Sequence, residues 1–271
     1  MTSHTPARRA ARAAGAVLML TLAAAGCAAH GEERVSSLRA PQVVEEGALT
    51  VCSDMPYEPF ESMKGGEPVG FDIDLIREVA AELDLRLEIK DTDFDAIQSG
   101  DALNSDQCDL AISAMTITGE RARVLDFSSP YFDASQALVV AKGSGIDALD
   151  DLDRQRIGVQ GGTTGELYVT DNAPASADVV PLEDAVAMEE ALTTRAVDAA
   201  VYDNTVVGDV VANNPDLEVS AEFDTGEQYG MAVKKNGNVD LLRSINKVLA
   251  TLEDDGGYDK IYATWFGGVQ E

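Results

Sequence analysis

The chain has 271 residues, of which 45% are hydrophobic, and 48 acidic against 20 basic residues give it a formal net charge of −28 at pH 7. This length and composition predict a real hydrophobic core with room for two α/β lobes, and they exclude a largely disordered chain. The strong negative charge would repel nucleic acid, so nucleic acid is excluded as a partner. Because the acidic residues are spread along the chain, the role of this charge is expected to be solubility.

Residues 1–26 have the pattern of an export signal. Arg8, Arg9 and Arg12 form a basic head, and AAGAVLMLTLAAAG is an apolar stretch too short to span a bilayer comfortably. Cys27 follows at once, so the segment resembles a bacterial lipoprotein signal in which that cysteine is lipidated and becomes the first residue. Cleavage there would remove three positive charges and move the net charge from −28 to −31. The alternative is a secreted protein that is cut within AAAG.

Residues 27–46 are expected to form a tether, because they are polar, aperiodic and rich in Ala, Ser, Glu and Gly. Cys52 and Cys108 are the cysteines that remain after it, and export to an oxidising compartment favours their pairing. Their positions count against a disulfide, since Cys52 lies late in a predicted strand and Cys108 lies just before another. The pairing is therefore left open by the sequence.

The next part of the chain alternates strands and helices, an order typical of parallel pairing. Strands are predicted at 48–54, 86–90 and 108–115, and helices at 70–83 and 93–103. The loop after the first strand carries Tyr57, Glu58 and Phe60. Tyr57 is expected either to pack on the surface of its lobe or to contact a ligand.

The segment ISAMTITGER, residues 112–121, runs from a buried strand into a hydroxyl-rich turn and a charged helix start. Ligands in open α/β sheets bind at such carboxyl ends, where Thr116 offers a hydroxyl and a free N–H group. Arg121 has planar donors that suit a carboxylate. The alternative for Arg121 alone is a solvated pair with Glu120 or Asp126.

A second body is predicted to begin after a turn-rich crossing at 128–135 and a strand at 136–142. The turn GGTTG (161–165) precedes a helix, and its backbone N–H groups would form an anion pocket. It is not a P-loop, because the following Lys-Ser/Thr is missing. A later strand ends at Asp203, which would either serve a site or cap the helix at 205–211.

The remaining segments predict a return to the first body. Strands are expected at 216–223 and 227–235, followed by two apolar-striped helices that break at 255–257. The aromatic residues of the last helix are expected to pack in the core.

Seven motifs in this order resemble one family, the extracytoplasmic solute-binding proteins of polar amino-acid ABC transporters (bacterial solute-binding protein family 3). The resemblance covers roughly residues 47–268 and rests on SDMPYEPFE, GFDIDLIREVA, CDLAISAMTITGERARVLDFSSPYF, GVQGGTTGE, AAVYD, EQYGMAVKK and GGYDKIYATWFG. It implies a two-lobed periplasmic-binding-protein fold in the α/β class, each lobe a mixed, mostly parallel sheet flanked by helices. Two crossing strands would join lobe 1 (47–131 and 230–271) to lobe 2 (132–229).

The resemblance also implies a binding site. Arg121 would hold the α-carboxylate of a free L-α-amino acid, with Thr116 and the Thr164 N–H beside it. Asp203 and the carbonyl of Ala114 would take the α-ammonium, and Tyr57 and Phe94 would enclose the side chain. The full set of expected ligand-binding residues is Asp54, Tyr57, Glu58, Phe94, Ser113, Ala114, Thr116, Arg121, Gln160, Thr163, Thr164 and Asp203.

This pairing of charges has a physical basis, because a buried zwitterion needs a partner for each of its charges. With Asp54, Tyr57, Glu58 and Gln160 expected on the opposite wall, a cationic side chain is predicted first, glutamine second, and an acidic side chain is excluded. The predicted function is to deliver the amino acid to an ABC import permease, as a lipid-anchored monomer with no cofactor and no metal.

Two other functions are weighed against this one. A catalytic relative on the same fold, such as a dehydratase, would need a spare acid or base, for which Glu58 and Asp54 are the candidates. A Ser-His-Asp or Cys-His set is excluded, because His4 lies in the signal and His30 in the tether. A sensor lobe of a membrane kinase or channel is the third possibility. The protein is therefore predicted not to be an enzyme.

Overall fold

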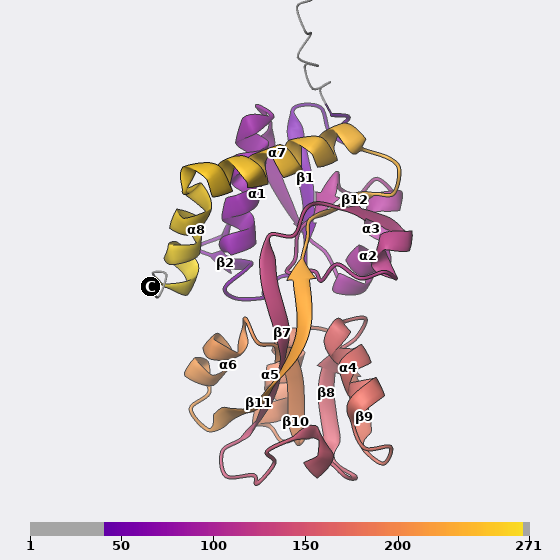
Figure 1. Ribbon diagram of the computed structural model, residues 1–271, viewed down its shortest axis with the longest axis vertical. Helices are drawn as coiled ribbons and strands as arrows, with labels where there is room; N and C mark the ends of the chain where they lie inside the picture. Colours follow the sequence, from indigo (N-terminus) through magenta and orange to yellow (C-terminus); the bar gives the residue numbers. More distant parts are fainter. Residues whose placement is uncertain (1–40, 268–271) are drawn as a thin grey trace, which may run out of the picture. The chain divides into compact units, whose positions relative to one another are not determined.

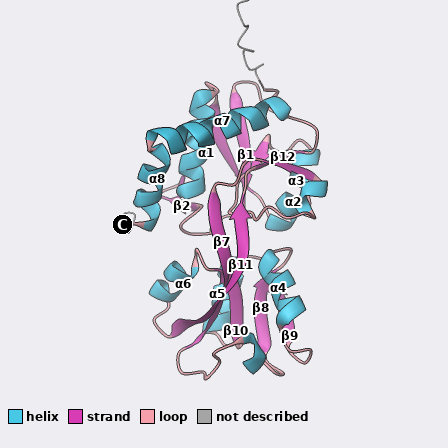
Figure 2. Cartoon of the chain, in the orientation of Figure 1, coloured by secondary structure: helices cyan, strands magenta, loops and turns pink. Residues whose placement is uncertain are grey.

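The computed structural model describes residues 41–267, which contain two five-stranded mixed sheets (Figures 1 and 2). In spatial order the first sheet consists of β4 (Arg86–Asp91), β1 (Ala48–Ser53), β5 (Leu110–Ala111), β12 (Ala232–Lys234) and β6 (Leu125–Phe127). Strand β1 is parallel to β4 and β5, whereas β12 is antiparallel to β5 and β6. The apolar run of β1 is buried along its whole length, as its sequence predicts.

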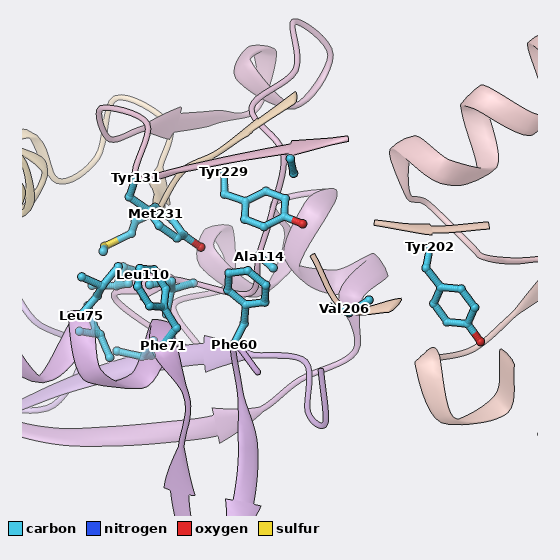
Figure 3. Close-up of a cluster of buried hydrophobic side chains, with 14 of the residues drawn as sticks. Phe60, Phe71, Leu75, Leu110, Ala114, Tyr131, Tyr202, Val206, Tyr229 and Met231 are labelled. Carbon is cyan, nitrogen blue, oxygen red and sulfur yellow. The ribbon is translucent and has the colours of Figure 1, made fainter. Parts of the chain in front are cut away.

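Helices cover the first sheet, and together they form the first lobe. They are α1 (Phe71–Glu82), α2 (Phe94–Gln98), α3 (Asp101–Asn104), α7 (Val239–Asp255) and α8 (Gly257–Phe266), with a hairpin of β2 (Ser62–Lys64) and β3 (Glu67–Val69) beside them. The predicted apolar stripe of α1 is buried in the core with Phe60, Tyr131 and Tyr229 (Figure 3). The single helix predicted at 93–103 is two helices, because Gly100 adopts a left-handed conformation with φ 81° between them.

The second sheet and its helices form the second lobe. In spatial order its strands are β11 (Leu217–Tyr229), β7 (Phe132–Ala141), β10 (Ala199–Asp203), β8 (Arg156–Gln160) and β9 (Asp178–Leu182). Its helices are η2 (Leu149–Asp151), α4 (Thr164–Asn172), α5 (Ala185–Thr193) and α6 (Val207–Asn213). Strands β8, β9 and β10 are parallel, while β7 is antiparallel to β10 and β11.

Strands β7 and β11 run side by side from one group of elements to the other (Figure 1). The segment predicted as a turn at 128–135 enters β7 at Phe132, because its backbone pairs with β11 as far as Tyr229. The same pairing joins the strand predicted at 216–223 and the start of the next one into the single strand β11. Tyr229 also bridges Thr116 of the first lobe, so both lobes contact this pair of strands.

The strand predicted at 108–115 forms a ladder only at Leu110 and Ala111. Beyond it the chain bends, because Ala114 adopts a left-handed φ of 41° and its N–H donates to a carboxylate oxygen of Asp72 at 2.8 Å. Ser113, Ala114 and Thr116, which follow the ladder, line a cavity.

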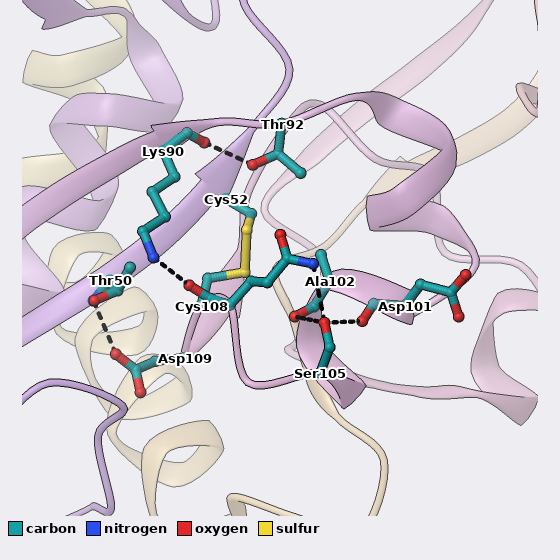
Figure 4. The surroundings of a disulfide bond; sticks show 10 residues. Thr50, Cys52, Lys90, Thr92, Asp101, Ala102, Ser105, Cys108 and Asp109 are labelled. Carbon is teal, nitrogen blue, oxygen red and sulfur yellow. Dashed lines mark hydrogen bonds between the residues drawn. A yellow bond between two sulfur atoms is a disulfide. The ribbon is translucent and has the colours of Figure 1, made fainter.

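Cys52 and Cys108 form a disulfide with their Cα atoms 5.8 Å apart (Figure 4). Asp109 fixes the chain beside Cys108, since its carboxylate accepts from the N–H groups of Val44 at 2.6 Å and Thr50 at 2.8 Å. The question that the sequence left open is therefore resolved in favour of the bond. A crosslink that closes a loop of this size, with a sequence separation of 56, contributes about 2–4 kcal/mol to the free energy of unfolding.

The predicted signal, Cys27 and most of the predicted tether lie outside the described residues. The described end of the tether contacts the first lobe, because the carbonyl of Gln42 accepts from Asn238 at 2.7 Å. Among residues 41–267, no helix combines the length and the apolar character that a membrane crossing requires.

Candidate functional site

A cavity lies where the carboxyl ends of β1, β8 and β10 meet the turn after β5. The lining residues include eleven of the twelve expected ligand-binding residues, namely Asp54, Tyr57, Phe94, Ser113, Ala114, Thr116, Arg121, Gln160, Thr163, Thr164 and Asp203. Glu58 is not among them; it is exposed and lines a separate depression with residues of α5 and α6.

Arg121 begins the short 3₁₀ helix η1 (Arg121–Arg123) and is only 4% exposed. Its guanidinium donates to the carbonyls of Thr116 at 2.8 Å and Gly162 at 3.0 Å, and it lies 5.1 Å from the centre of the Phe94 ring. Burial lowers the pKa of Arg121 to about 10, so the side chain stays charged at neutral pH. Its alternative as a solvated partner of Glu120 or Asp126 is wrong, because those acids pair with Arg123 and Lys235.

Asp203 stands at the end of β10, opposite in charge to Arg121. Its carboxylate accepts from Gln136 at 2.6 Å and from the Tyr229 hydroxyl. Burial, and then the negative charge of Glu227, raise the pKa of Asp203 to about 6, against hydrogen bonds that lower it. The alternative role as a helix cap is wrong, because α6 has Val206 at its N-cap position and no side-chain cap.

Glu227 is a carboxylate at this site that sequence reasoning missed. It accepts from the hydroxyls of Thr164 at 2.6 Å and Thr116 at 2.7 Å and from Gln136 at 2.9 Å. Burial acts to raise the pKa of Glu227, but the hydrogen bonds outweigh it and the pKa is lowered. Glu227 therefore adds a negative charge behind two residues that line the cavity, one from each lobe. Other lining residues that were not expected are Gln136, Gly165, Met188, Val201 and Tyr202.

Asp54 and Gln160 form a second wall that joins the lobes. The Gln160 side-chain amide donates to Asp54 at 2.8 Å. Burial raises the pKa of Asp54 to about 6, against the lowering effect of that hydrogen bond. At neutral pH this carboxylate is ionised and has a single neutral amide as its side-chain partner, an arrangement that suits a cation.

The turn at Gly162 brings the second lobe close to α2. Its φ is 73°, and a Cβ atom there would lie 2.4 Å from Asp95 Oδ1 and 3.0 Å from Gln98 Nε2. Helix α4 begins just after it, where Thr163 Oγ1 accepts from the Glu166 N–H at 3.1 Å. The left-handed φ therefore favours glycine at the position whose carbonyl accepts from Arg121.

A metal centre has no support in the described part of the chain. Across residues 41–267, no group of three or more His, Cys, Asp or Glu side chains is placed to hold a metal ion.

The chain and its fold have counterparts among known proteins. The family model of bacterial extracellular solute-binding proteins, family 3, matches residues 49–268. A probable histidine-binding protein of Neisseria gonorrhoeae is 32% identical over 93% of this chain and 94% of its own length. The arginine-binding extracellular protein ArtP of Bacillus subtilis is 32% identical over 81% of this chain and 86% of its own.

A solved structure of an ancestral arginine-binding protein bound to arginine has 42% sequence identity and a TM-score of 0.77 to this protein. The match covers 82% of this chain and 99% of that one. Both the extent of the family model and the identity of these relatives support the same assignment. The chain belongs to the bacterial extracellular solute-binding proteins, family 3.

Proposed function

We propose that the protein binds a free cationic L-amino acid, arginine, lysine or histidine, outside the cytoplasmic membrane and delivers it to an ABC import permease. Binding of an amino acid and its delivery to an importer are the functions of its family. The choice of a cationic ligand rests on one observation, the balance of charges around the cavity. Glutamine is the second choice, and an acidic amino acid is excluded.

The charge balance follows from four side chains. Arg121 and Asp54 line the cavity with Asp203, and Glu227 lies directly behind it. One positive and three negative groups give a net charge of about −2 when all are ionised. An amino acid with a neutral side chain leaves this charge unchanged, whereas a cationic one offsets part of it. A second carboxylate would add to the repulsion from Asp54.

The proposed ligand pose gives each charge a partner. Arg121 holds the α-carboxylate and Asp203 the α-ammonium, while Asp54 meets the cationic side chain in exchange for its bond to Gln160. Since Arg121 already lies over one face of Phe94, the ligand side chain would stack on the remaining aromatic surface, which Tyr57 supplies in part.

We also propose that closure follows the division expected from the sequence, with lobe 1 at 47–131 and 230–271 and lobe 2 at 132–229. The two sheets support this proposal, because β7 begins at Phe132 and β11 ends at Tyr229. A ligand that contacts Arg121 on one lobe and Asp203 on the other would favour the closed arrangement.

Calorimetry with arginine, lysine, histidine, glutamine and glutamate tests the choice of ligand. At neutral pH we expect a cationic amino acid to bind tightest, glutamine more weakly, and glutamate not detectably. Asp54→Asn is expected to reduce the preference for arginine over glutamine, because it removes the charge that a cationic side chain would meet. Tighter binding of glutamate than of both arginine and glutamine would contradict the proposal.

The affinity for arginine is also expected to fall as the pH drops below about 6. Burial is the main cause that raises the pKa values of Asp54 and Asp203 to about 6, and a bound cation would lower both. Binding at and below this pH therefore releases protons, and for arginine the number approaches two as the pH falls below 6. Glutamine should release fewer, because it gives Asp54 no charged partner. Calorimetry in buffers with different ionisation enthalpies measures this release.

A catalytic relative, such as a dehydratase, is favoured by no observation. Glu58, one of its two candidate acids, is absent from the cavity lining, and the relatives named above bind amino acids. We propose a binding role without a catalytic step.

We propose that Cys27 is lipidated and that it anchors a monomeric protein to the outer face of the membrane. The sequence pattern of residues 1–27 and the extracellular family support the proposal. Cys27→Ala is expected to move the protein from the membrane fraction to the soluble fraction, because the lipid would be its anchor. Fractionation of cells that express each form measures this, and a variant that stays with the membranes would contradict lipid anchoring.

A further inference from the structure

Two buried carboxyl groups, which the proposed ligand pose does not use, lie beneath the cavity. Glu61 and Asp72 are both fully buried. One oxygen of Glu61 accepts from the Ser113 hydroxyl at 2.7 Å, and one oxygen of Asp72 accepts from the Ala114 N–H and the Tyr131 hydroxyl, each at 2.8 Å. Their sequence neighbours Phe60 and Phe71 belong to the same buried cluster as Ala114 (Figure 3). Both acids therefore hold residues of the cavity wall.

The other two oxygens of this pair lack a donor. Glu61 Oε2 and Asp72 Oδ1 are buried, and within the described residues neither has a hydrogen-bond partner. Neither acid forms an ion pair with a described residue. The titratable groups that face them are Asp54, from the end of β1, and the hydroxyls of Tyr57, Tyr131 and Tyr258, all of them acids or phenols. Two ionised carboxylates in such surroundings would be strongly unfavourable.

A single proton between the two unpaired oxygens would satisfy both. Burial, and then the charge of Asp72, raise the pKa of Glu61 well above its usual range. Burial raises the pKa of Asp72 to about 7, against the hydrogen bonds that it accepts. The other oxygen of Asp72 accepts two hydrogen bonds and that of Glu61 accepts one, so the negative charge is better stabilised on Asp72 and Glu61 is the group that carries the proton.

We propose that Glu61 and Asp72 share one proton as a carboxylic acid–carboxylate pair, and that this pair positions Ser113 and Ala114 for amino-acid binding. The proposal rests on the function proposed above for the same cavity. Ala114 needs such a restraint, because its φ of 41° is unfavourable for a residue other than glycine. Ser113 also accepts from the Asp54 N–H at 3.0 Å, so the pair reaches the wall that would meet the ligand side chain.

Loss of the shared proton would disturb this wall. With both acids ionised, repulsion between Glu61 and Asp72 would displace the segment that carries Ser113 and Ala114. Because both folded-state pKa values are raised, the stabilising effect of the bound proton is present at low pH and is lost as the pH rises above neutral. Affinity for the ligand should fall over the same range.

The test compares arginine binding by the wild type and by Glu61→Gln from neutral to alkaline pH, using calorimetry. Glutamine has the same shape, and its amide can donate permanently to Asp72 while its oxygen accepts from Ser113. We expect the variant to bind within about threefold of the wild type at neutral pH. The wild type should then lose about tenfold or more in affinity relative to the variant at alkaline pH. Deprotonation of the ligand's own ammonium affects both proteins equally and cancels in this ratio.

Asp109→Asn is the matched control, since Asp109 is a buried acid of the same lobe that accepts from the backbone of Val44 and Thr50, away from the cavity. It should keep the wild-type pH profile. Identical alkaline profiles in the wild type and in Glu61→Gln would overturn the proposed role in binding.

Infrared spectroscopy of the ligand-free protein tests the shared proton independently of any amino acid. At neutral pH the wild type should show the carbonyl stretch of a protonated, buried carboxylic acid, and Glu61→Gln should lack it. Absence of this band from the wild type would overturn the pairing. A band without any arginine binding by the wild type would instead contradict the proposed ligand, so the two failures are distinguishable.

Discussion

Arg121→Ala is expected to abolish measurable amino-acid binding. Removal of one partner of a buried charge pair costs about 3–5 kcal/mol, which corresponds to two to four decades of affinity. Two effects act together here. The ligand carboxylate loses its cation, and Asp203 and Glu227, whose charges act on Arg121, are left without its opposing charge. Calorimetry with arginine measures the loss, and thermal unfolding checks that the fold is kept.

Arg123→Ala is the matched control for this change. Arg123 lies two residues away in the same short helix, but its side chain is 72% exposed and pairs with Glu120 on the surface. Its replacement should change affinity by less than about 0.5 kcal/mol. If Arg121→Ala retained affinity within about threefold of the wild type, Arg121 would not be the residue that holds the carboxylate.

Asp203→Ala is expected to have an effect of similar size on the other charge of the ligand. The α-ammonium would lose its carboxylate, again at a cost of about 3–5 kcal/mol. Gln136 and Tyr229 would also lose the acceptor that orients them. Calorimetry of this variant and of the exposed control Asp209→Asn, on the helix that follows, measures the difference.

Asp203→Asn adds a specific signature to that test. Because the pKa of Asp203 is raised to about 6, its ionisation should account for part of the loss of arginine affinity below this pH. The asparagine variant should bind weakly at every pH and release fewer protons on binding, by up to one as the pH falls below 6. Unchanged proton release would show that Asp203 is not the group that meets the ammonium.

The side chains at strand ends could be predicted from the sequence. Asp54, Gln160 and Asp203 each lie at or just after the end of a strand, and the carboxyl ends of parallel strands meet at one edge of their sheet. The position of Arg121 near this edge could be predicted as well, because it follows the predicted strand at 108–115 by six residues. Local patterns therefore placed these residues at strand ends but left a second role open for Arg121 and Asp203, whose expected contacts with a ligand came from the family resemblance.

Gln136 and Glu227 could not be predicted in this way. They lie within the crossing strands β7 and β11 and are 91 residues apart, so their contact depends on the pairing of those strands. A polar residue in the otherwise apolar run QALVV was the available signal for Gln136, and it did not indicate a site. Glu227 carried no local signal, because exposed polar residues surround it along β11.

The path of loops could not be predicted from the sequence either. It decided both the disulfide, which the sequence left open, and Glu58, which was wrongly expected to line the cavity. Cys108 reaches Cys52 because Asp109 fixes the path of a loop, which no periodicity describes. Glu58 follows Tyr57 in the same Pro-braced loop, yet Tyr57 lines the cavity and Glu58 faces solvent. The direction of the loop backbone, rather than the residue type, decides which of these two side chains points into the cavity.

A substitution at Gly162 is expected to change the affinity for all amino acids without changing the preference among them. The Gly162 carbonyl accepts from Arg121, and the left-handed φ of 73° at this position would be strained in any residue with a side chain. A substitution there would weaken the closed state of the empty and the loaded protein alike, without changing the walls that face the ligand side chain. Each 1.4 kcal/mol lost from closure would weaken the apparent affinity for every amino acid by up to about tenfold and leave their order unchanged. The sensitivity of uptake to external concentration could therefore evolve at this position while the choice of nutrient stays constant.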